Sequence, residues 1–114
     1  MQNAPNIGEL TTPGKCLADF SLVPIGDNST SYAQQIAAVQ RLCERSGVKY
    51  SMHATGTTLE GPWDQVQRVI GCAHSLVHQQ GTGRIQTDIR LSTRTDKPQS
   101  IESEIASVNK VLAT

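Results

Sequence analysis

Polar side chains recur at every second position of several short segments of this sequence. Side chains two residues apart in a β-strand point to the same side, so strands would gather these groups on one face of a sheet. The set comprises Asp19, Ser21, Lys49, Ser51, His53, Thr58, Glu60, Gln86, Asp88 and Arg90. Carboxylates stabilise positive charge and the guanidinium of Arg90 binds anions. This face is therefore a candidate site for a polar or cationic small molecule.

Two other interpretations of the same face stay open. An antiparallel sheet can expose one polar face to water, with cross-strand ion pairs that contribute little stability. The face can also pack against the sheet of another subunit, with charges paired across the interface. The residue pattern alone does not separate these three alternatives.

Catalysis and metal binding have weaker support. His53 with Glu60 or Asp88 and a serine would form a nucleophile relay, but no nucleophile elbow is present to position the serine. His74 and His78 stand four residues apart, a spacing that suits a metal, yet no cysteine or carboxylate on that face completes a site. We therefore expect no catalytic residue and no metal site.

Alternating and helical patterns follow one another along the chain. The predicted strands span 16–24, 48–54, 57–60 and 84–93. The predicted helices span 32–45, 62–80 and 100–113. This order, with right-handed crossovers, predicts an α+β fold of the ferredoxin-like type, β-α-β-β-α-β-α. Its four-stranded antiparallel sheet has the order 4-1-3-2, with helices on one face and the last helix as an addition.

The apolar sides of these elements predict the core. On the strands they carry Cys16, Ala18, Phe20, Leu22, Val48, Tyr50, Met52, Ala54, Thr57, Leu59, Ile85, Thr87, Ile89 and Leu91. The three cysteines, Cys16, Cys43 and Cys72, lack metal-binding spacing and are odd in number, which favours reduced packing residues. Gly71 lies inside the second predicted helix at a cost of about 1 kcal/mol, and a close approach to a neighbouring element would explain it.

Length and composition narrow the class of protein. The 114 residues fit one domain, which we place at 16–114 after a flexible N-terminal arm at 1–15. Ten basic and ten acidic residues give no surplus charge for nucleic-acid binding, and the open face has no aromatic residue to stack bases. No apolar stretch approaches the roughly 20 residues of a membrane helix, and the N-terminus has no signal-like apolar region. We expect a cytoplasmic protein without nucleic-acid or membrane partners.

Three segments together resemble a known family. They are CLADFSLVPIG at 16–26, TGTTLEGPWDQV at 55–66 and RIQTDIRLSTRTDK at 84–97. Over about residues 15–113 the chain resembles the thiamine-binding protein family of small ferredoxin-like domains, formerly an uncharacterised protein family. The residues that match the family motifs are Thr57, Thr58, Glu60, Gly61, Arg84, Thr87, Asp88, Arg90 and Arg94.

The resemblance implies a non-catalytic, homo-oligomeric protein that binds thiamine or a related metabolite and needs no cofactor. Family members pair as dimers, and often as tetramers, through their sheets. Thiamine offers a cationic thiazolium, an aminopyrimidine and a hydroxyethyl arm. The residues that we expect to bind it are Ser21, Thr58, Glu60, Asp88 and Arg90. The wider candidate set adds Asp19, Ser51, His53 and Thr57. Because the chain carries a single copy of the domain, any pocket between domains needs two subunits.

Overall fold

The structure, a computed structural model, describes residues 4–114. The strands are β1 (Cys16–Ile25), β2 (Lys49–His53), β3 (Gly56–Gly61) and β4 (Arg84–Ser92). The helices are α1 (Ala33–Ser46), α2 (Trp63–Gln79) and α3 (Ile101–Leu112), and a short 3-10 turn, η1, spans Ile7–Glu9. The first three residues of the predicted N-terminal arm lie outside the described residues.

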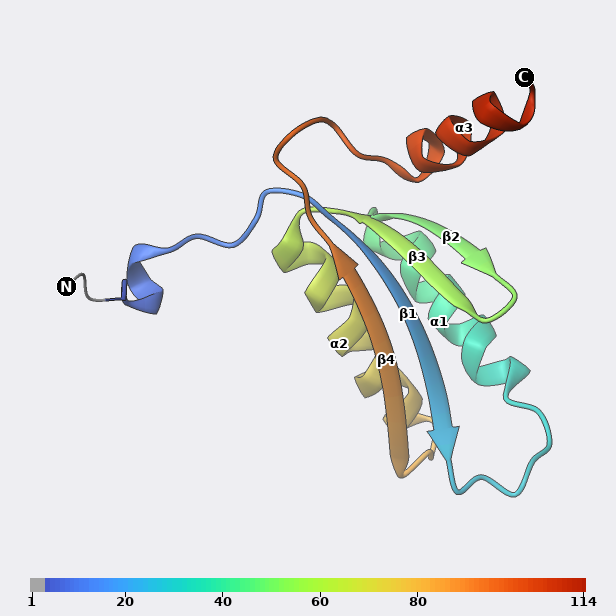
Figure 1. Cartoon of the computed structure of the whole chain (residues 1–114). Helices are drawn as coiled ribbons and strands as arrows, with labels where there is room; N and C mark the ends of the chain where they lie inside the picture. Colours follow the sequence, from blue (N-terminus) through green and yellow to red (C-terminus); the bar gives the residue numbers. More distant parts are fainter. Residues whose placement is uncertain (1–3) are drawn as a thin grey trace.

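The strands form one antiparallel sheet in the order β2-β3-β1-β4 (Figure 1). This confirms the predicted order 4-1-3-2 and the ferredoxin-like α+β fold. Phe20 in β1 lies opposite Thr57 in β3 and opposite Ile89 in β4. β1 is therefore a central strand, and its alternate residues face opposite sides of the sheet.

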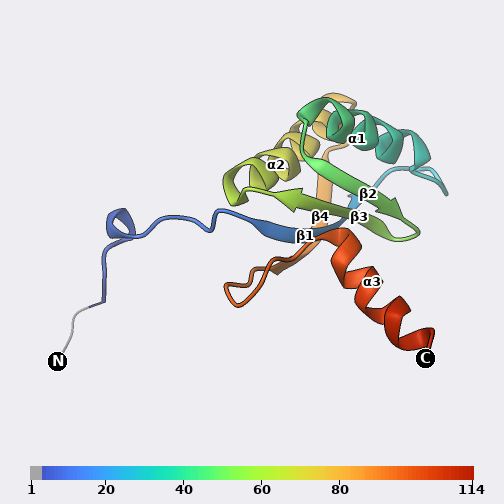
Figure 2. The same cartoon turned by 90° about the horizontal axis from the view of Figure 1, so that it is seen from above.

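Helices α1 and α2 cover one face of this sheet and bury its apolar side chains (Figure 2). Alternation in β1 is reproduced, since Cys16, Ala18, Phe20 and Leu22 are all buried. Each large apolar side chain buried in this way contributes about 1.5–3 kcal/mol. Burial also raises the pKa of the Cys16 thiol. A buried neutral thiol is unreactive, which agrees with its predicted role in packing.

Three residues that were predicted to be in the core are exposed on the outer strands of the sheet. Met52, Ile89 and Leu91 lie on the helix-covered side, but they are 61%, 43% and 38% exposed. They belong to β2 and β4, the two outer strands, each of which has a neighbouring strand on one side only. Alternation identifies the side of a strand, whereas the position of that strand in the sheet decides whether the side is covered.

Helix α3 begins on the other face of the sheet. Figure 2 shows α1 and α2 on one side and α3 projecting away from the opposite side. Ser100 caps the helix as predicted, because its hydroxyl accepts a hydrogen bond from the Ser103 N–H at 3.0 Å. The prediction of helices on one face thus describes α1 and α2, and α3 is a separate addition. Within residues 4–114, no helix combines the length and the apolar character needed to cross a bilayer.

Candidate functional site

The strand register gathers the predicted polar residues into rows across the open face, the face opposite α1 and α2. Asp19 lies opposite Thr58 on one side and opposite Arg90 on the other. Ser51 lies opposite Thr58 in the next pairing. These four residues form one row across all four strands, and Ser21 opposite Asp88 begins the neighbouring row.

A shallow hollow of about 550 Å³ lies over these rows. Its lining residues are Asp19, Ser21, Thr55, Asp88, Ile89 and Arg90. The structure therefore brings four predicted site residues together around one space. Thr55 was not predicted, because it lies in the turn between β2 and β3, where alternation gives no information about direction.

Two charged residues that line this hollow have no ion-pair partner within the described chain. Asp88 and Arg90 are exposed, and neither forms an ion pair with another residue of the described chain. A carboxylate and a guanidinium on one rigid sheet can bind a cationic and an anionic group of the same ligand.

Asp19 instead pairs with His53. The Asp19 Oδ1 lies 2.6 Å from the His53 Nε2. The Thr55 N–H donates to the His53 Nδ1 at 3.3 Å, so Nδ1 carries a lone pair and the proton is on Nε2. The imidazole is thereby held in one orientation at the end of the β2–β3 hairpin, and it directs its N–H to the carboxylate.

The Glu60 carboxylate forms a hydrogen bond and ion pairs with other residues of the chain. Its carboxylate accepts a hydrogen bond from the Ile101 N–H at 2.8 Å and lies 3.3 Å from the Lys15 Nζ and 3.7 Å from the Lys49 Nζ. The side chain is only 11% exposed. Glu60 therefore joins β3 to the first turn of α3, where a carboxylate also interacts favourably with the helix dipole.

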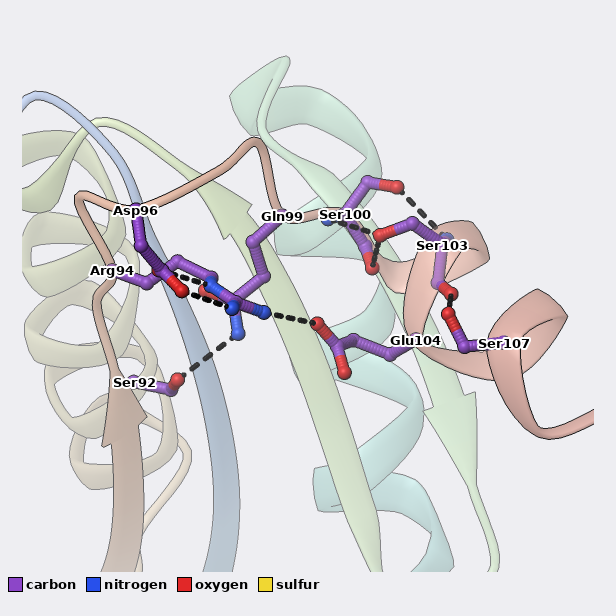
Figure 3. A network of polar contacts seen from close by, with 8 residues as sticks. All are labelled: Ser92, Arg94, Asp96, Gln99, Ser100, Ser103, Glu104 and Ser107. Atoms are coloured by element: carbon purple, nitrogen blue, oxygen red, sulfur yellow. Dashed lines mark hydrogen bonds and ion pairs between the residues drawn. The ribbon is translucent and has the colours of Figure 1, made fainter.

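Further polar contacts hold the start of α3 near the sheet (Figure 3). Arg94 donates two hydrogen bonds to Asp96, at 2.7 and 2.6 Å, and its Nη1 lies 3.8 Å from Glu104 in α3. The hydrogen bond from Arg94 holds the pKa of Asp96 well below its ordinary value. Gln99 donates to the Ser92 hydroxyl at 3.1 Å. These contacts fix the linker between β4 and α3 and so set the direction in which α3 leaves the body.

Thr57 lies away from the open face. It is 3% exposed on the helix-covered side, and its hydroxyl accepts a hydrogen bond from the Gln40 Nε2 at 2.8 Å. His74 and His78 likewise have local partners, the Thr87 hydroxyl at 2.7 Å and the Thr82 carbonyl at 2.9 Å. Among residues 4–114, no group of three metal-ligating side chains is close enough to bind an ion.

Fold and site together define a ferredoxin-like domain with a polar, ligand-sized hollow on its open sheet face. The model of the family described as thiamine-binding protein matches residues 18–109. The chain therefore belongs to the thiamine-binding protein family.

Two relatives support this membership by sequence. The UPF0045 protein ECM15 of Eremothecium gossypii is 40% identical over 97 residues, which cover 85% of this chain and 92% of the relative. The UPF0045 protein sll0230 of Synechocystis is 39% identical over 92 residues, which cover 81% of this chain and 75% of that protein.

Solved structures share the fold. The hypothetical protein MJ1052 from Methanocaldococcus jannaschii superposes with a TM-score of 0.78 at 24% identity, covering 86% of this chain and 99% of that one. A domain of unknown function from Bacillus cereus gives a TM-score of 0.71 at 24% identity, covering 80% and 86%. At this identity the likeness concerns the fold.

Proposed function

We propose that this protein is a non-catalytic, homo-oligomeric binding protein whose ligand is thiamine or a thiamine-related metabolite. The observation that carries the proposal is the hollow on the open face, where Asp88 and Arg90 present unpaired charges beside Asp19 and Ser21. The family to which the chain belongs supports thiamine as the ligand.

The chemistry of the hollow matches the parts of thiamine. The Asp88 carboxylate forms no ion pair within the described chain and stabilises the thiazolium. Arg90 binds a hydroxyl, or the phosphate of an esterified form, by charge-assisted hydrogen bonds. The hydroxyl of Ser21 in the hollow, and that of Thr58 opposite Asp19 beside it, donate to or accept from the remaining polar atoms.

Three further residues have roles at the rim of this proposed site. Ser51 extends the row that contains Thr58. His53 fixes the orientation of Asp19. Glu60 acts through α3, whose first turn it binds beside the open face.

The same geometry supports binding rather than catalysis. His53 pairs with Asp19, whereas the sequence pattern suggested Glu60 or Asp88 as its partner. Its Nδ1 accepts the Thr55 N–H, and the Thr55 hydroxyl lies 3.5 Å from the same nitrogen. This distance is too long for the hydrogen bond that activates a nucleophile.

Exposed apolar residues support homo-oligomers. Helix α3 has no buried residue, and Ile105, Val108 and Leu112 on its apolar side are 58%, 58% and 74% exposed. An isolated helix of this length is marginal in water, so its apolar side requires a partner. Ile89 and Leu91 on the unpaired β4 edge add a second apolar surface. We assign both surfaces to contacts with further copies of this chain.

Calorimetry with thiamine tests the ligand. We expect wild-type protein to bind thiamine, and the substitution Asp88→Asn to weaken the binding about twofold to fivefold, because an exposed carboxylate–cation contact contributes up to about 1 kcal/mol. Glu44→Gln is the matched control. It removes one negative charge from an exposed position of α1, remote from the open face, and should leave the affinity unchanged.

Two outcomes would contradict the proposal. Absence of heat and of a melting-temperature shift at millimolar thiamine would exclude thiamine as the ligand. Equal losses in Asp88→Asn and Glu44→Gln would place the ligand elsewhere, since only net charge would then matter.

A further inference from the structure

The N-terminal arm carries two apolar side chains that its own chain does not cover. Ile7 and Leu10 are 91% and 63% exposed. They stand three residues apart around the 3-10 turn η1, and the Leu10 N–H donates to the Ile7 carbonyl at 3.1 Å, so both side chains lie on one side of the turn. Single exposed apolar residues are ordinary, but here a turn that buries no residue holds two of them together.

The arm is held where it leaves the body and then projects away from it. The Thr12 hydroxyl donates to the Asp64 carboxylate, in the first turn of α2, at 3.0 Å. Pro13 disfavours helical backbone at Thr12, so the chain does not turn back at that residue. Figure 1 and Figure 2 show the segment before it running away from the sheet and its helices. The apolar pair is therefore placed to contact a neighbouring molecule.

An apolar groove lies between α1 and α2. It consists of two hollows of about 230 Å³ each, and Leu42 of α1 lines both. Each hollow has room for one branched aliphatic side chain. The other apolar residues that line the groove are Ala38, Val48, Val69, Cys72 and Leu76. None of these residues lines the open-face hollow, so the groove is a separate site.

Three arginines line the same groove. Arg68 borders one hollow, and Arg41 and Arg45 border the other. All three are exposed, and none forms an ion pair with a described residue. No acidic residue of the described chain lines either hollow. The groove therefore favours an apolar segment that carries negative charge.

The arm has this combination of side chains. Glu9 lies between Ile7 and Leu10 in the sequence and forms no ion pair within residues 4–114. With the apolar pair in the groove, its carboxylate lies among the arginines and accepts charge-assisted hydrogen bonds. Helix α3 also combines apolar and acidic residues, but basic residues of its own chain already bind Glu102 and Glu104.

We infer that the groove between α1 and α2 is the docking site for the N-terminal arm of a second copy of this chain, with Ile7 and Leu10 in the two hollows and Glu9 beside the arginines. The inference rests on the homo-oligomeric assembly proposed above and adds an interface separate from the apolar surfaces of α3 and β4. Because arm and groove are different surfaces, two copies can exchange arms reciprocally. Each docked arm covers Cys72 in the groove of the other copy.

Alkylation of Cys72 by N-ethylmaleimide reports whether the groove is covered. Cys72 is half-buried, whereas the other two cysteines are buried, so mass spectrometry of the folded protein follows one thiol. At a concentration at which light scattering shows full assembly, Leu10→Glu should speed the alkylation at least fivefold, because it places a charge in an apolar hollow. Thr11→Glu adds the same charge at the next residue, which points to the other side of the extended chain, and should change the rate by less than twofold.

A charge exchange tests whether the arm comes from another copy. Glu9→Arg and Arg68→Glu should each speed the alkylation about twofold to fivefold, because like charges then meet in the groove. An equimolar mixture of these two variants should return the rate toward that of the wild type. In the mixture, the arm of each variant finds the opposite charge in the groove of the other.

Three outcomes would overturn the inference. They are equal alkylation rates in wild type and Leu10→Glu, equal increases in Leu10→Glu and Thr11→Glu, and a mixture that alkylates no more slowly than its components. In the last case the arm covers the groove of its own chain. Each of these results leaves the proposed ligand and the assembly through α3 and β4 standing. A monomeric wild-type protein would overturn the proposed assembly itself.

Discussion

Gly56 is the first residue of β3 and lies close against the backbone of β1. A Cβ at this position would lie 2.6 Å from the Phe20 carbonyl oxygen and 3.2 Å from the His53 Cε1. The first contact is with backbone, which cannot rotate away as a side chain can. The absence of a side chain thus lets the tip of the hairpin close against β1.

We expect Gly56→Ala to lower the free energy of unfolding by about 1–3 kcal/mol, because the added methyl must displace the hairpin or β1. Urea unfolding at one fixed protein concentration measures this change. Fixing the concentration matters because association shifts apparent stability.

Gly71→Ala is the control. Gly71 interrupts α2, and a close approach to a neighbouring element was expected there. Instead, a Cβ added at Gly71 would meet no heavy atom of the described chain within 4 Å beyond its own helix backbone. Alanine is the better helix former, so this variant should gain about 0.5–1 kcal/mol. Similar effects of the two substitutions would show that the contact at Gly56 does not limit stability.

At the scale of elements, α3 is attached to the body by polar contacts at its start. Glu60 accepts from the Ile101 N–H, and Lys49 binds Glu102. The hydrogen bond from Lys49 lowers the pKa of Glu102, and the same contact raises the pKa of Lys49. Because no residue of α3 is buried, these contacts determine where the helix points.

Glu60→Gln should loosen this attachment. The variant loses the ion pairs with two lysines and weakens the hydrogen bond to the Ile101 N–H. We therefore expect hydrogen exchange of the Ile101 amide to become about fivefold to tenfold faster. Glu104→Gln, which removes only the 3.8 Å contact of a half-exposed carboxylate with Arg94, should change that rate by less than about twofold. Unchanged exchange in Glu60→Gln would mean that α3 is held by other contacts.

Acidification provides a second test of the same attachment. The folded-state pKa of Glu102 lies below its ordinary value of 4.5. The contact with Lys49 therefore contributes its full stabilisation at pH values above 4.5. The stabilisation is lost as pH falls through the lowered folded value. The NMR signals of the first turn of α3 should therefore change toward those of the detached helix as the pH falls below 4.5, before the core unfolds.

The whole molecule is more extended than a compact domain of its length. Its radius of gyration is 16.9 Å, against about 13 Å for a compact chain of this length. Figure 1 shows the cause, because the N-terminal segment and α3 both project from the sheet-and-helix body. A projecting amphipathic helix is stable when another surface covers its apolar side.

Light scattering after size-exclusion chromatography tests whether that surface belongs to another copy. Wild-type protein should have the mass of a dimer or tetramer, and Val108→Glu should reduce it, because the charge lies on the apolar side of α3. Ala106→Glu adds the same charge on the other side of the helix and should leave the mass unchanged. A monomeric wild-type protein, or equal effects of the two variants, would contradict the proposed assembly.

Much of the fold is encoded locally, which is why the sequence predicts it. Alternation in β1 places Phe20 and Asp19 on opposite faces of the sheet, and Ser100 marks the start of α3. Both could be predicted because side-chain periodicity and capping depend only on near neighbours. The ferredoxin-like strand order then follows from the order of the elements and the handedness of crossovers. The open-face residues Asp88 and Arg90 were predicted for the same reason.

Other features depend on contacts between distant segments, and only the tertiary structure decides them. The engagement of Glu60 by Ile101, forty-one residues away, and the exposure of Ile89 depend on which elements become neighbours. Pairing between β1 and β3 ends at Phe20, whereas pairing between β1 and β4 continues to Ile25, and the Gln40 amide reaches the Thr57 hydroxyl only after α1 packs on the sheet. Periodicity determined which side each residue faces, whereas long-range packing determined whether that side is buried, paired or open to a ligand.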